Sequence, residues 1–202
     1  MVKTKLLLLS LVVVFIVVVT GHSQAAAPAN ILKNGGFESG VMDPWSTYGD
    51  MVKAEILAKD AIEGKSCLHL IISKKEVNFW NGGLQNGNQV FTKGKKYTLS
   101  AYVKSPQKLQ INFKPELAKD PWSGFGDKVM TTTDKWAEYY VTTPVMTADV
   151  TPASITFHIT FDVGEYFMDG VFFYEGDYVA GMITPVQPKE KSATTWGQLK
   201  SN

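Results

Sequence analysis

The stretch SITFHITFD, residues 154–162, alternates apolar and polar side chains along its whole length. Because successive side chains of a β-strand point to opposite faces of a sheet, this alternation predicts a strand with one apolar and one polar face. The side chains expected to face a core are Ile155, Phe157, Ile159 and Phe161. The polar side chains of the other face are Thr156, His158 and Thr160. A strand of this kind is typical of an antiparallel sheet that covers a core with one face.

Similar short patterns recur along the chain between turn residues. Further strands are predicted for residues 51–59, 67–73, 97–104, 109–117, 136–143 and 166–174. In the last of these, one face is expected to carry Phe167, Asp169, Val171 and Phe173. Many short strands without a long amphipathic helix predict an all-β fold, a β-sandwich jelly roll of two antiparallel sheets.

The first 25 residues have the layout of a secretory signal peptide. Lys3 and Lys5 precede an apolar run from Leu6 to Val19, and small residues follow, with Ala25 at the expected cleavage position. The run has 14 residues, fewer than the roughly 20 that a membrane-spanning helix needs. We therefore expect residues 1–25 to be removed and the protein to be secreted or to lie at the cell surface. Retention of the segment as an anchor is the alternative.

The composition argues against nucleic acid as a partner. Every basic residue is a lysine, and removal of Lys3 and Lys5 leaves 18 of them against 19 acidic residues, a formal charge of −1. Arginine dominates the bidentate recognition of phosphate and guanine, so a near-neutral domain without arginine is a poor nucleic-acid binder. The single cysteine, Cys67, lies in an apolar run and is predicted to be a small core residue.

The remaining chain divides into one domain and a tail. Residues 30–180 are enough for one hydrophobic core. Residues 184–202 are rich in proline and lysine, and we expect a flexible tail. Its segment TTWGQLK, residues 194–200, is either a frayed end or a docking tag.

Five motifs, in this order, resemble a carbohydrate-binding module of the family 4/9 type, which is galactose-binding-like in fold. They are ILKNGGFESG (31–40), EGKSCLHL (63–70), GKKYTLSAYVKS (94–105), DKWAEYYVT (134–142) and YFMDGVFFY (166–174). The resemblance covers roughly residues 30–175. It implies a jelly roll in which one concave sheet face forms a groove for a polysaccharide chain. It also implies that Trp136 is buried in the core.

The resemblance further implies a structural calcium ion, remote from the groove. The matching carboxylate ligands are Glu38 of the GFE turn and Asp169 of the last motif, and carbonyls near Gly36 and Lys65 match the remaining ligand region. Calcium takes six to eight oxygen ligands, so carboxylates and carbonyls suit it. Where the family usually has a second aspartate, this chain has Gly170. The alternative is that Asp169 caps a turn or pairs with a lysine.

Sugar contacts are predicted from polar strand faces and from aromatic residues in loops. A groove needs rings that stack on sugar C–H faces and polar groups that bind hydroxyls. The predicted contacts are Trp45, Tyr48, Trp80, Gln85, Tyr102, Gln110, Asn112, Trp122 and His158. Gln85 faces the groove if Leu84 is core, whereas a bulge at Gly82 and Gly83 would reverse this. Trp122 is expected to contribute most.

No catalytic apparatus is expected. A glycosidase needs two carboxylates across a cleft, and the predicted groove face offers no such pair, since Glu116 and Asp162 come at strand ends. We therefore predict a secreted, non-catalytic polysaccharide-binding module. The alternative is an extracellular jelly roll for protein contact, which would show a flat apolar patch in place of a groove.

Overall fold

The computed structural model describes residues 27–183, and within them the chain forms ten β-strands. The strands are β1 (Trp45–Tyr48), β2 (Val52–Leu57), β3 (Cys67–Ile72), β4 (Gly83–Phe91), β5 (Tyr97–Lys104), β6 (Gln110–Leu117), β7 (Lys128–Thr131), β8 (Ala137–Thr142), β9 (Val150–His158) and β10 (Gly164–Glu175). The predicted signal peptide, residues 1–25, and the predicted tail, residues 184–202, lie outside the described residues. In the described part of the chain no helix is long and apolar enough to cross a membrane.

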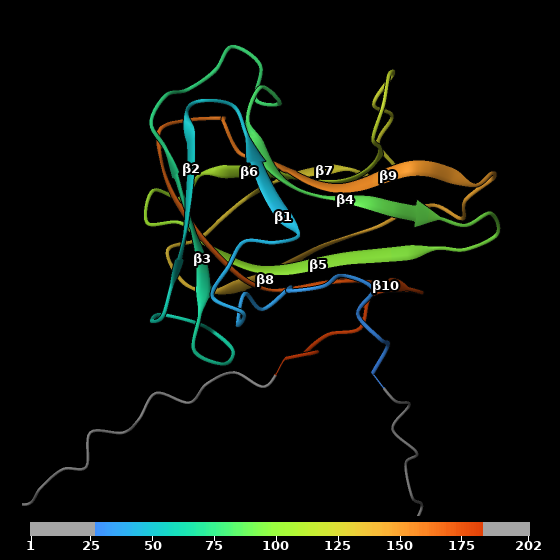
Figure 1. The fold of residues 1–202 in the computed structure, drawn as a ribbon, viewed down its shortest axis with the longest axis horizontal. Helices are drawn as coiled ribbons and strands as arrows, with labels where there is room; N and C mark the ends of the chain where they lie inside the picture. The colour runs from blue at the N-terminus through green and yellow to red at the C-terminus, as the bar shows by residue number, and fades with distance from the viewer. Residues whose placement is uncertain (1–26, 184–202) are drawn as a thin grey trace, which may run out of the picture.

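The strands form two five-stranded antiparallel sheets that stack as a sandwich (Figure 1). Sheet I has the order β1-β4-β9-β6-β7, and sheet II has the order β2-β3-β10-β5-β8. The chain passes repeatedly from one sheet to the other, as from β4 to β5 and from β9 to β10, which is typical of jelly rolls. The predicted all-β fold of two antiparallel sheets is confirmed.

The core lies between the sheets and uses the alternation seen in the sequence. Phe157 of β9 and Phe113 of β6 are both fully buried, and their rings meet edge-on with centroids 4.7 Å apart. Leu84 and Cys67 are also fully buried, and the cysteine is unpaired. Because the apolar side chains of sheet I point inward, its polar side chains lie together on the outer face.

Strand β10 departs from the predicted alternation. Its register with β5 shifts between Asp169 and Phe172, which marks a β-bulge. Phe173, beyond the bulge, lies in the core, whereas Phe167, before it, stacks on His69 with ring centroids 4.6 Å apart on the outer face of sheet II. The single face predicted for Phe167 and Phe173 was wrong, because an extra residue in a bulge reverses the side chains that follow it.

Two tryptophans have the opposite environments to those predicted. Trp45 is 3% exposed; its ring packs 6.1 Å from that of Phe157, and its indole N–H donates to the carbonyl of Asn34. Trp136 is only partly buried and donates its indole N–H to the carbonyl of Asp60. Trp45 begins a strand, so its side chain turns into the core. Trp136 precedes β8 and packs across the outer face of sheet II.

Both ends of the described chain lie along β10. At the start, the amide of Ile31 donates to the carbonyl of Phe173 at 2.7 Å, and Asn30 Oδ1 accepts from the amide of Phe173 at 2.9 Å. At the end, Ile183 is 5% exposed, and its Cγ2 atom would lie 3.1 Å from a β-carbon placed on Gly170. The domain is therefore entered and left on the side of sheet II (Figure 1).

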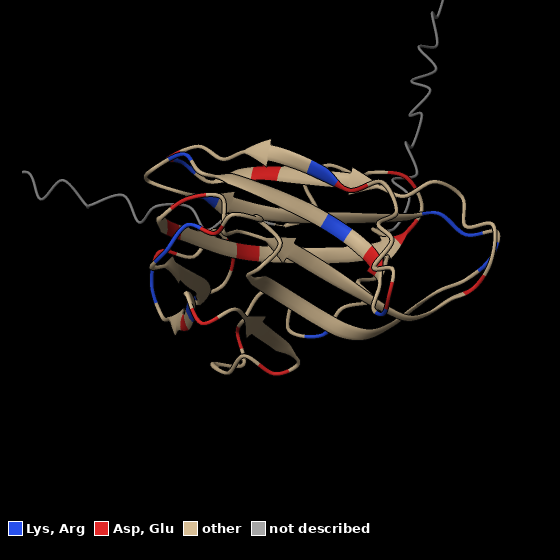
Figure 2. Ribbon diagram, turned by 90° about the horizontal axis from the view of Figure 1, so that it is seen from above, with Lys and Arg blue, Asp and Glu red and all other residues tan. Residues whose placement is uncertain are grey.

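Charged residues of both signs are interspersed over the loops and strands (Figure 2). Several lysines have an acidic partner in an ion pair, such as Lys95 with Glu175 at 2.7 Å and Lys96 with Asp177 at 2.6 Å. Residues 27–183 therefore present no extended basic face of the kind that binds nucleic acid.

Candidate functional site

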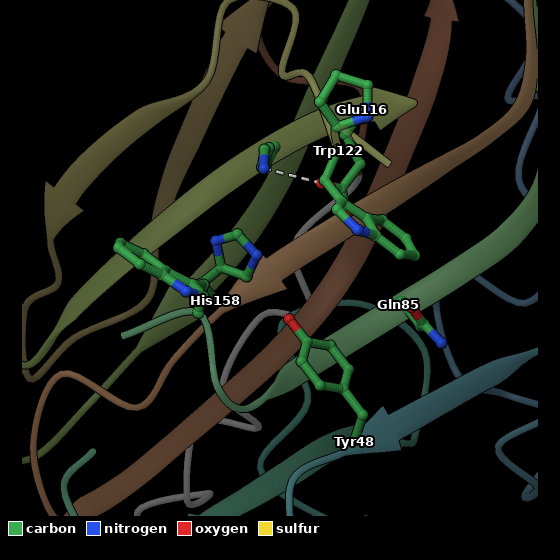
Figure 3. A pocket seen from close by; sticks show the side chains of 8 residues that line it. Tyr48, Gln85, Glu116, Trp122 and His158 are labelled. Carbon is green, nitrogen blue, oxygen red and sulfur yellow. Dashed lines mark ion pairs between the residues drawn. The ribbon is translucent and has the colours of Figure 1, made fainter. Parts of the chain in front are cut away.

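The outer face of sheet I carries a cavity of about 630 Å³ (Figure 3). Strands β1, β4, β6 and β9 and the loops before β4 and after β6 supply its walls. The lining residues are Tyr48, Trp80, Gln85, Lys114, Glu116, Pro121, Trp122 and His158. A hollow of this size falls within the range of roughly 300–1,000 Å³ that is common for small-molecule sites.

A buried ion pair forms part of the cavity floor. Lys114 Nζ lies 2.9 Å from Glu116 Oε2, and the two side chains are only 16% and 7% exposed. The other oxygen, Oε1 of Glu116, accepts hydrogen bonds from the hydroxyls of Thr156 and Ser154 on β9. Burial, together with the charge of Glu116, raises the pKa of Tyr48 far above its usual range, so its phenol stays protonated. The floor thus offers both hydrogen-bond donors and an acceptor to a ligand.

His158 lies at the end of β9, opposite Asn112 of β6. The Nδ2 group of Asn112 donates to Nδ1 of His158 at 3.1 Å, and both residues are at least 95% buried. Burial, and then the nearby Lys114 ammonium, lower the pKa of His158 to about 4. The imidazole is therefore neutral at physiological pH.

Two exposed tryptophans flank the polar floor. Trp80 and Trp122 are 52% and 53% exposed. The ring of Trp80 packs edge-on against Phe79, with centroids 4.9 Å apart. Phe79 in turn stacks on Phe161, with centroids 4.4 Å apart. Phe161 was predicted to face the core, but it lies three residues beyond the end of β9 and stacks on Phe79 of this loop instead.

Trp122 is held by a tight turn that follows β6. Its main-chain φ of 57° lies in the left-handed region, and its amide donates to the carbonyl of Lys119 at 2.7 Å. Only a few per cent of non-glycine residues adopt such a φ, and functional sites are enriched in them. With Pro121 beside it, the turn holds the indole over the cavity (Figure 3).

Most of the predicted contact residues meet at this cavity. Those that line it are Tyr48, Trp80, Gln85, Trp122 and His158. Asn112 lies beneath His158, and Gln110 shares the same face of β6 without lining the cavity. Because Leu84 is core, Gln85 faces outward, as the alternation required.

Two predicted contacts are not at the cavity. Trp45 belongs to the core, as described above. Tyr102 lies on β5 in sheet II, where its hydroxyl donates to Glu138 Oε2 at 3.3 Å. Alternation separates the core face of a strand from its outer face, but it does not say which of the two sheets the strand joins.

Three residues of the cavity were not among the predicted contacts. Lys114 and Glu116 lie two and four positions beyond Asn112, so they share its face of β6. The alternation predicted for residues 109–117 already places Lys114 outward with Gln110 and Asn112, and one further step along the strand would have added Glu116. Pro121 precedes Trp122 in the loop, and its ring forms part of the same wall. Glu116 is the one carboxylate among the residues that line the cavity.

The predicted calcium ligands also come together, away from the cavity. A β-carbon on Gly36 would lie 3.9 Å from both Asp169 Oδ1 and Glu38 Cγ. Glu38 Oε1 accepts from the amide of Lys65 at 2.9 Å, and Asp169 Oδ1 accepts from the amide of Gly170 at 2.7 Å. Asp169 is fully buried, and this burial raises its pKa to about 6.

The acidic side chains alone do not make a metal site. Among residues 27–183, no group of three or more histidine, cysteine, aspartate or glutamate side chains is arranged to hold a metal ion. A calcium ion beside Gly36 would therefore need main-chain carbonyls in addition to the carboxylates of Glu38 and Asp169. This mixed donor set fits the oxygen preference of calcium.

Comparison with known proteins places the chain among sugar-binding domains. Residues 29–163 match the family model CBM_4_9, described as a carbohydrate binding domain. No curated protein matches the chain.

Solved structures share the fold at low identity. A CBM4 structure is 16% identical, with a TM-score of 0.55, over 71% of this chain and 99% of the other. The CBM22-1 xylan-binding domain of Xyn10C from Paenibacillus barcinonensis is 19% identical, with a TM-score of 0.57, over 77% of this chain and 100% of the other. TmCBM61, solved with β-1,4-galactotriose, is 20% identical, with a TM-score of 0.53, over 73% of this chain and 99% of the other.

Proposed function

This chain belongs to the carbohydrate binding domain family CBM_4_9, and from that premise we propose that it holds a polysaccharide in the cavity of sheet I. The single observation that supports this assignment is the pair of exposed tryptophans, Trp80 and Trp122, beside a buried polar floor. Apolar ring faces next to fixed donors and acceptors suit the two kinds of surface of a sugar.

The proposed ligand is a neutral glycan. The Lys114 ammonium is compensated by Glu116, and His158 is uncharged at neutral pH, so the cavity has no free positive charge to attract an acidic chain. The solved relatives include a xylan-binding domain and a domain complexed with β-1,4-galactotriose. Xylan and β-1,4-galactan are therefore the first ligands to test.

The binding is proposed to be non-catalytic. Hydrolysis of a glycosidic bond needs two carboxyl groups on either side of it. In the cavity, Glu116 is already engaged by Lys114, Thr156 and Ser154. A carboxylate held in this way acts as a hydrogen-bond acceptor and not as a proton donor.

A glycan array followed by isothermal titration tests the proposal. Stacking of one indole on a sugar should contribute about 1–2 kcal/mol, so Trp122→Ala should weaken binding roughly tenfold. Tyr140→Ala is the matched control, because Tyr140 is also a large exposed ring, 44% accessible, but lies on β8 of sheet II. It should bind as the wild type does.

The same experiment addresses the alternative of a protein-contact domain. If no glycan binds the wild type at millimolar concentration, protein contact becomes the better assignment. If Trp122→Ala remains folded and binds the best glycan unchanged, Trp122 is not the stacking residue, and Trp80 takes its place.

The proposal has two further parts, export of the protein and a structural calcium ion. We propose that residues 1–25 direct secretion and are removed, so that the mature protein begins near Ala26. Amino-terminal sequencing of exported material that still contained Leu6–Val19 would contradict this.

We also propose a structural calcium ion held by Glu38 and Asp169 with nearby carbonyls. In that role the metal would add to the amides of Ile62, Glu63 and Gly170, which already donate to the buried Asp169 carboxylate.

A further inference from the structure

A buried amide lies behind the histidine of the cavity. Asn112 and His158 are directly opposite residues of the neighbouring strands β6 and β9. The side-chain amide of Asn112 donates to Nδ1 of His158 at 3.1 Å. They are 2% and 5% exposed, so the amide is shielded from water and the imidazole is nearly so. Because the two residues occupy paired positions of neighbouring strands, the pairing of β6 with β9 brings their side chains together.

The direction of this hydrogen bond determines where the imidazole proton lies. A neutral imidazole has one nitrogen that accepts and one that carries the proton. If Nδ1 accepts from Asn112, the proton is on Nε2. In the described part of the chain, Nε2 of His158 has no hydrogen-bond partner, while the residue lines the cavity. The free N–H therefore belongs to the ligand site.

We propose that Asn112 is a positioning residue that holds His158 in its neutral Nε2–H form, and that His158 donates this N–H to an oxygen of the bound sugar. This inference rests on the proposed function, since it assigns a ligand atom to the same cavity. The oxygen is one that can accept, such as a ring, glycosidic or hydroxyl oxygen of the glycan.

The surroundings of His158 favour the neutral ring. Lys114 on β6 disfavours a second positive charge, and Asp127 on the following loop opposes this effect more weakly. Phe79 packs against the imidazole from the loop before β4, with centroids 5.8 Å apart and planes at 61°. The other titratable groups that line the cavity are Glu116 on β6 and Tyr48 on β1. Burial is the larger cause and Lys114 adds to it, so the pKa lies near 4 and the neutral form predominates above about pH 5.

A neutral donor has a functional advantage in this position. Lys114 already directs an ammonium toward Glu116, and a charged imidazolium beside it would repel it and cost desolvation energy. A neutral N–H supplies the hydrogen bond without that penalty. We therefore expect the affinity for a neutral glycan to be constant from about pH 8 to pH 5 and to change only below that range.

Nitrogen-15 NMR of the histidine rings tests the tautomer directly. Residues 27–183 contain two histidines, His69 and His158. His69 serves as an internal reference, because both of its ring nitrogens lie 2.8 Å from carboxylate oxygens, those of Glu55 and Glu165. At pH 7 the spectrum should show the proton of His158 on Nε2. A proton on Nδ1 would overturn the proposal.

Variants of Asn112 test its positioning role. Asn112→Asp replaces the donor by a carboxylate of the same shape, which must accept a proton from Nδ1. At pH 8 the neutral ring would then lack its Nε2–H, and affinity should fall about three- to tenfold, the range of one hydrogen bond. As the pH falls to 6 the ring is protonated on both nitrogens, because an adjacent carboxylate favours the charged form, and affinity should recover.

Variants of His158 test the donor itself. His158→Phe keeps a ring against Phe79 but has no N–H, so binding should weaken about three- to tenfold. His158→Gln offers a side-chain N–H at similar reach and should restore part of the loss. Circular dichroism establishes that each variant is folded before titration with the glycan selected on the array.

The outcomes separate this inference from the proposed function. If Asn112→Asp keeps the flat pH profile and affinity of the wild type, or if His158→Phe binds unchanged, the inference is wrong although glycan binding stands. If the wild type binds no glycan, the proposed function fails and the ligand role of His158 fails with it. The NMR measurement then still confirms or overturns the tautomer fixed by Asn112.

Discussion

Removal of the Lys114 ammonium should destabilise the domain more than the loss of a surface ion pair. In Lys114→Met the long apolar stem is kept, but Glu116, only 7% exposed, loses its cation. Breaking a buried pair on one side typically costs about 3–5 kcal/mol, because an uncompensated charge stays buried. Two hydroxyls still donate to Glu116 Oε1, so we expect the low end, about 3 kcal/mol. For a domain of this size that corresponds to a fall in Tm of about 6–12 °C.

The assay is urea unfolding followed by circular dichroism, with two matched variants. Lys104→Met is the control, because Lys104 is equally buried at 14% exposure but its partner Asp60 is 49% exposed; its cost should be about 1 kcal/mol. The double variant Lys114→Met/Glu116→Gln removes both charges and should recover more than half of the loss. A deficit below about 0.5 kcal/mol, or a double variant as unstable as the single one, would refute the reasoning.

Three further measurements address other parts of the structure. Trp45→Ala should lose about 3–5 kcal/mol of unfolding free energy, as for a buried aromatic residue. Trp136→Ala should lose only about 1–2 kcal/mol, because its ring is partly solvated. Equal losses in denaturant titrations of the two variants would contradict the environments described above. A chelator should lower the Tm of the wild type, by the mass action of a ligand that binds only the folded state, and Glu38→Gln should abolish the response; an unchanged wild-type Tm would exclude calcium. His158 has a pKa lowered to about 4, so below about pH 6.5 the unfolded chain binds a proton at this residue that the folded domain does not, which costs the wild type an amount on the order of 2 kcal/mol between pH 6.5 and 4. Asp169, whose pKa is raised to about 6, has the opposite effect in the same range, so the quantity to compare is the unfolding free energy of the wild type minus that of His158→Gln. This difference should fall by about 2 kcal/mol across that range, and a constant difference would contradict the lowered pKa.

The fold could be predicted because strand alternation is a local property. In residues 154–162 and 109–113, every second side chain is large and apolar, and a sheet with one buried face is the structure that uses this pattern. The prediction was wrong for Phe167, where the β10 bulge changes the phase. A bulge depends on the pairing with β5, and pairing is not visible within one strand.

The candidate site could be predicted in part. Gln85 and His158 follow from the phase of their strands, because Leu84 and Phe157 beside them are core. Tyr102 has the right phase but lies in sheet II, since sheet membership depends on the order of strands in space. Trp45 was misplaced because a loop was expected where β1 begins. Its burial depends on contacts with Phe37 and Phe157 that are distant in sequence.

The two ends of the described residues lie along β10, and this position determines how the domain can be presented to a solid surface. Ile31 and Ile183 lie on the side of sheet II, while the cavity opens from the outer face of sheet I. A covalent attachment at residue 31 or 183 would therefore project from the side of sheet II and would not cover the cavity of sheet I. If the cavity of sheet I binds a glycan, as proposed, a tether at either end would leave this face free to contact an insoluble glycan. Fusion partners and immobilising tags at either end should be tolerated for the same reason, without shielding the tryptophans.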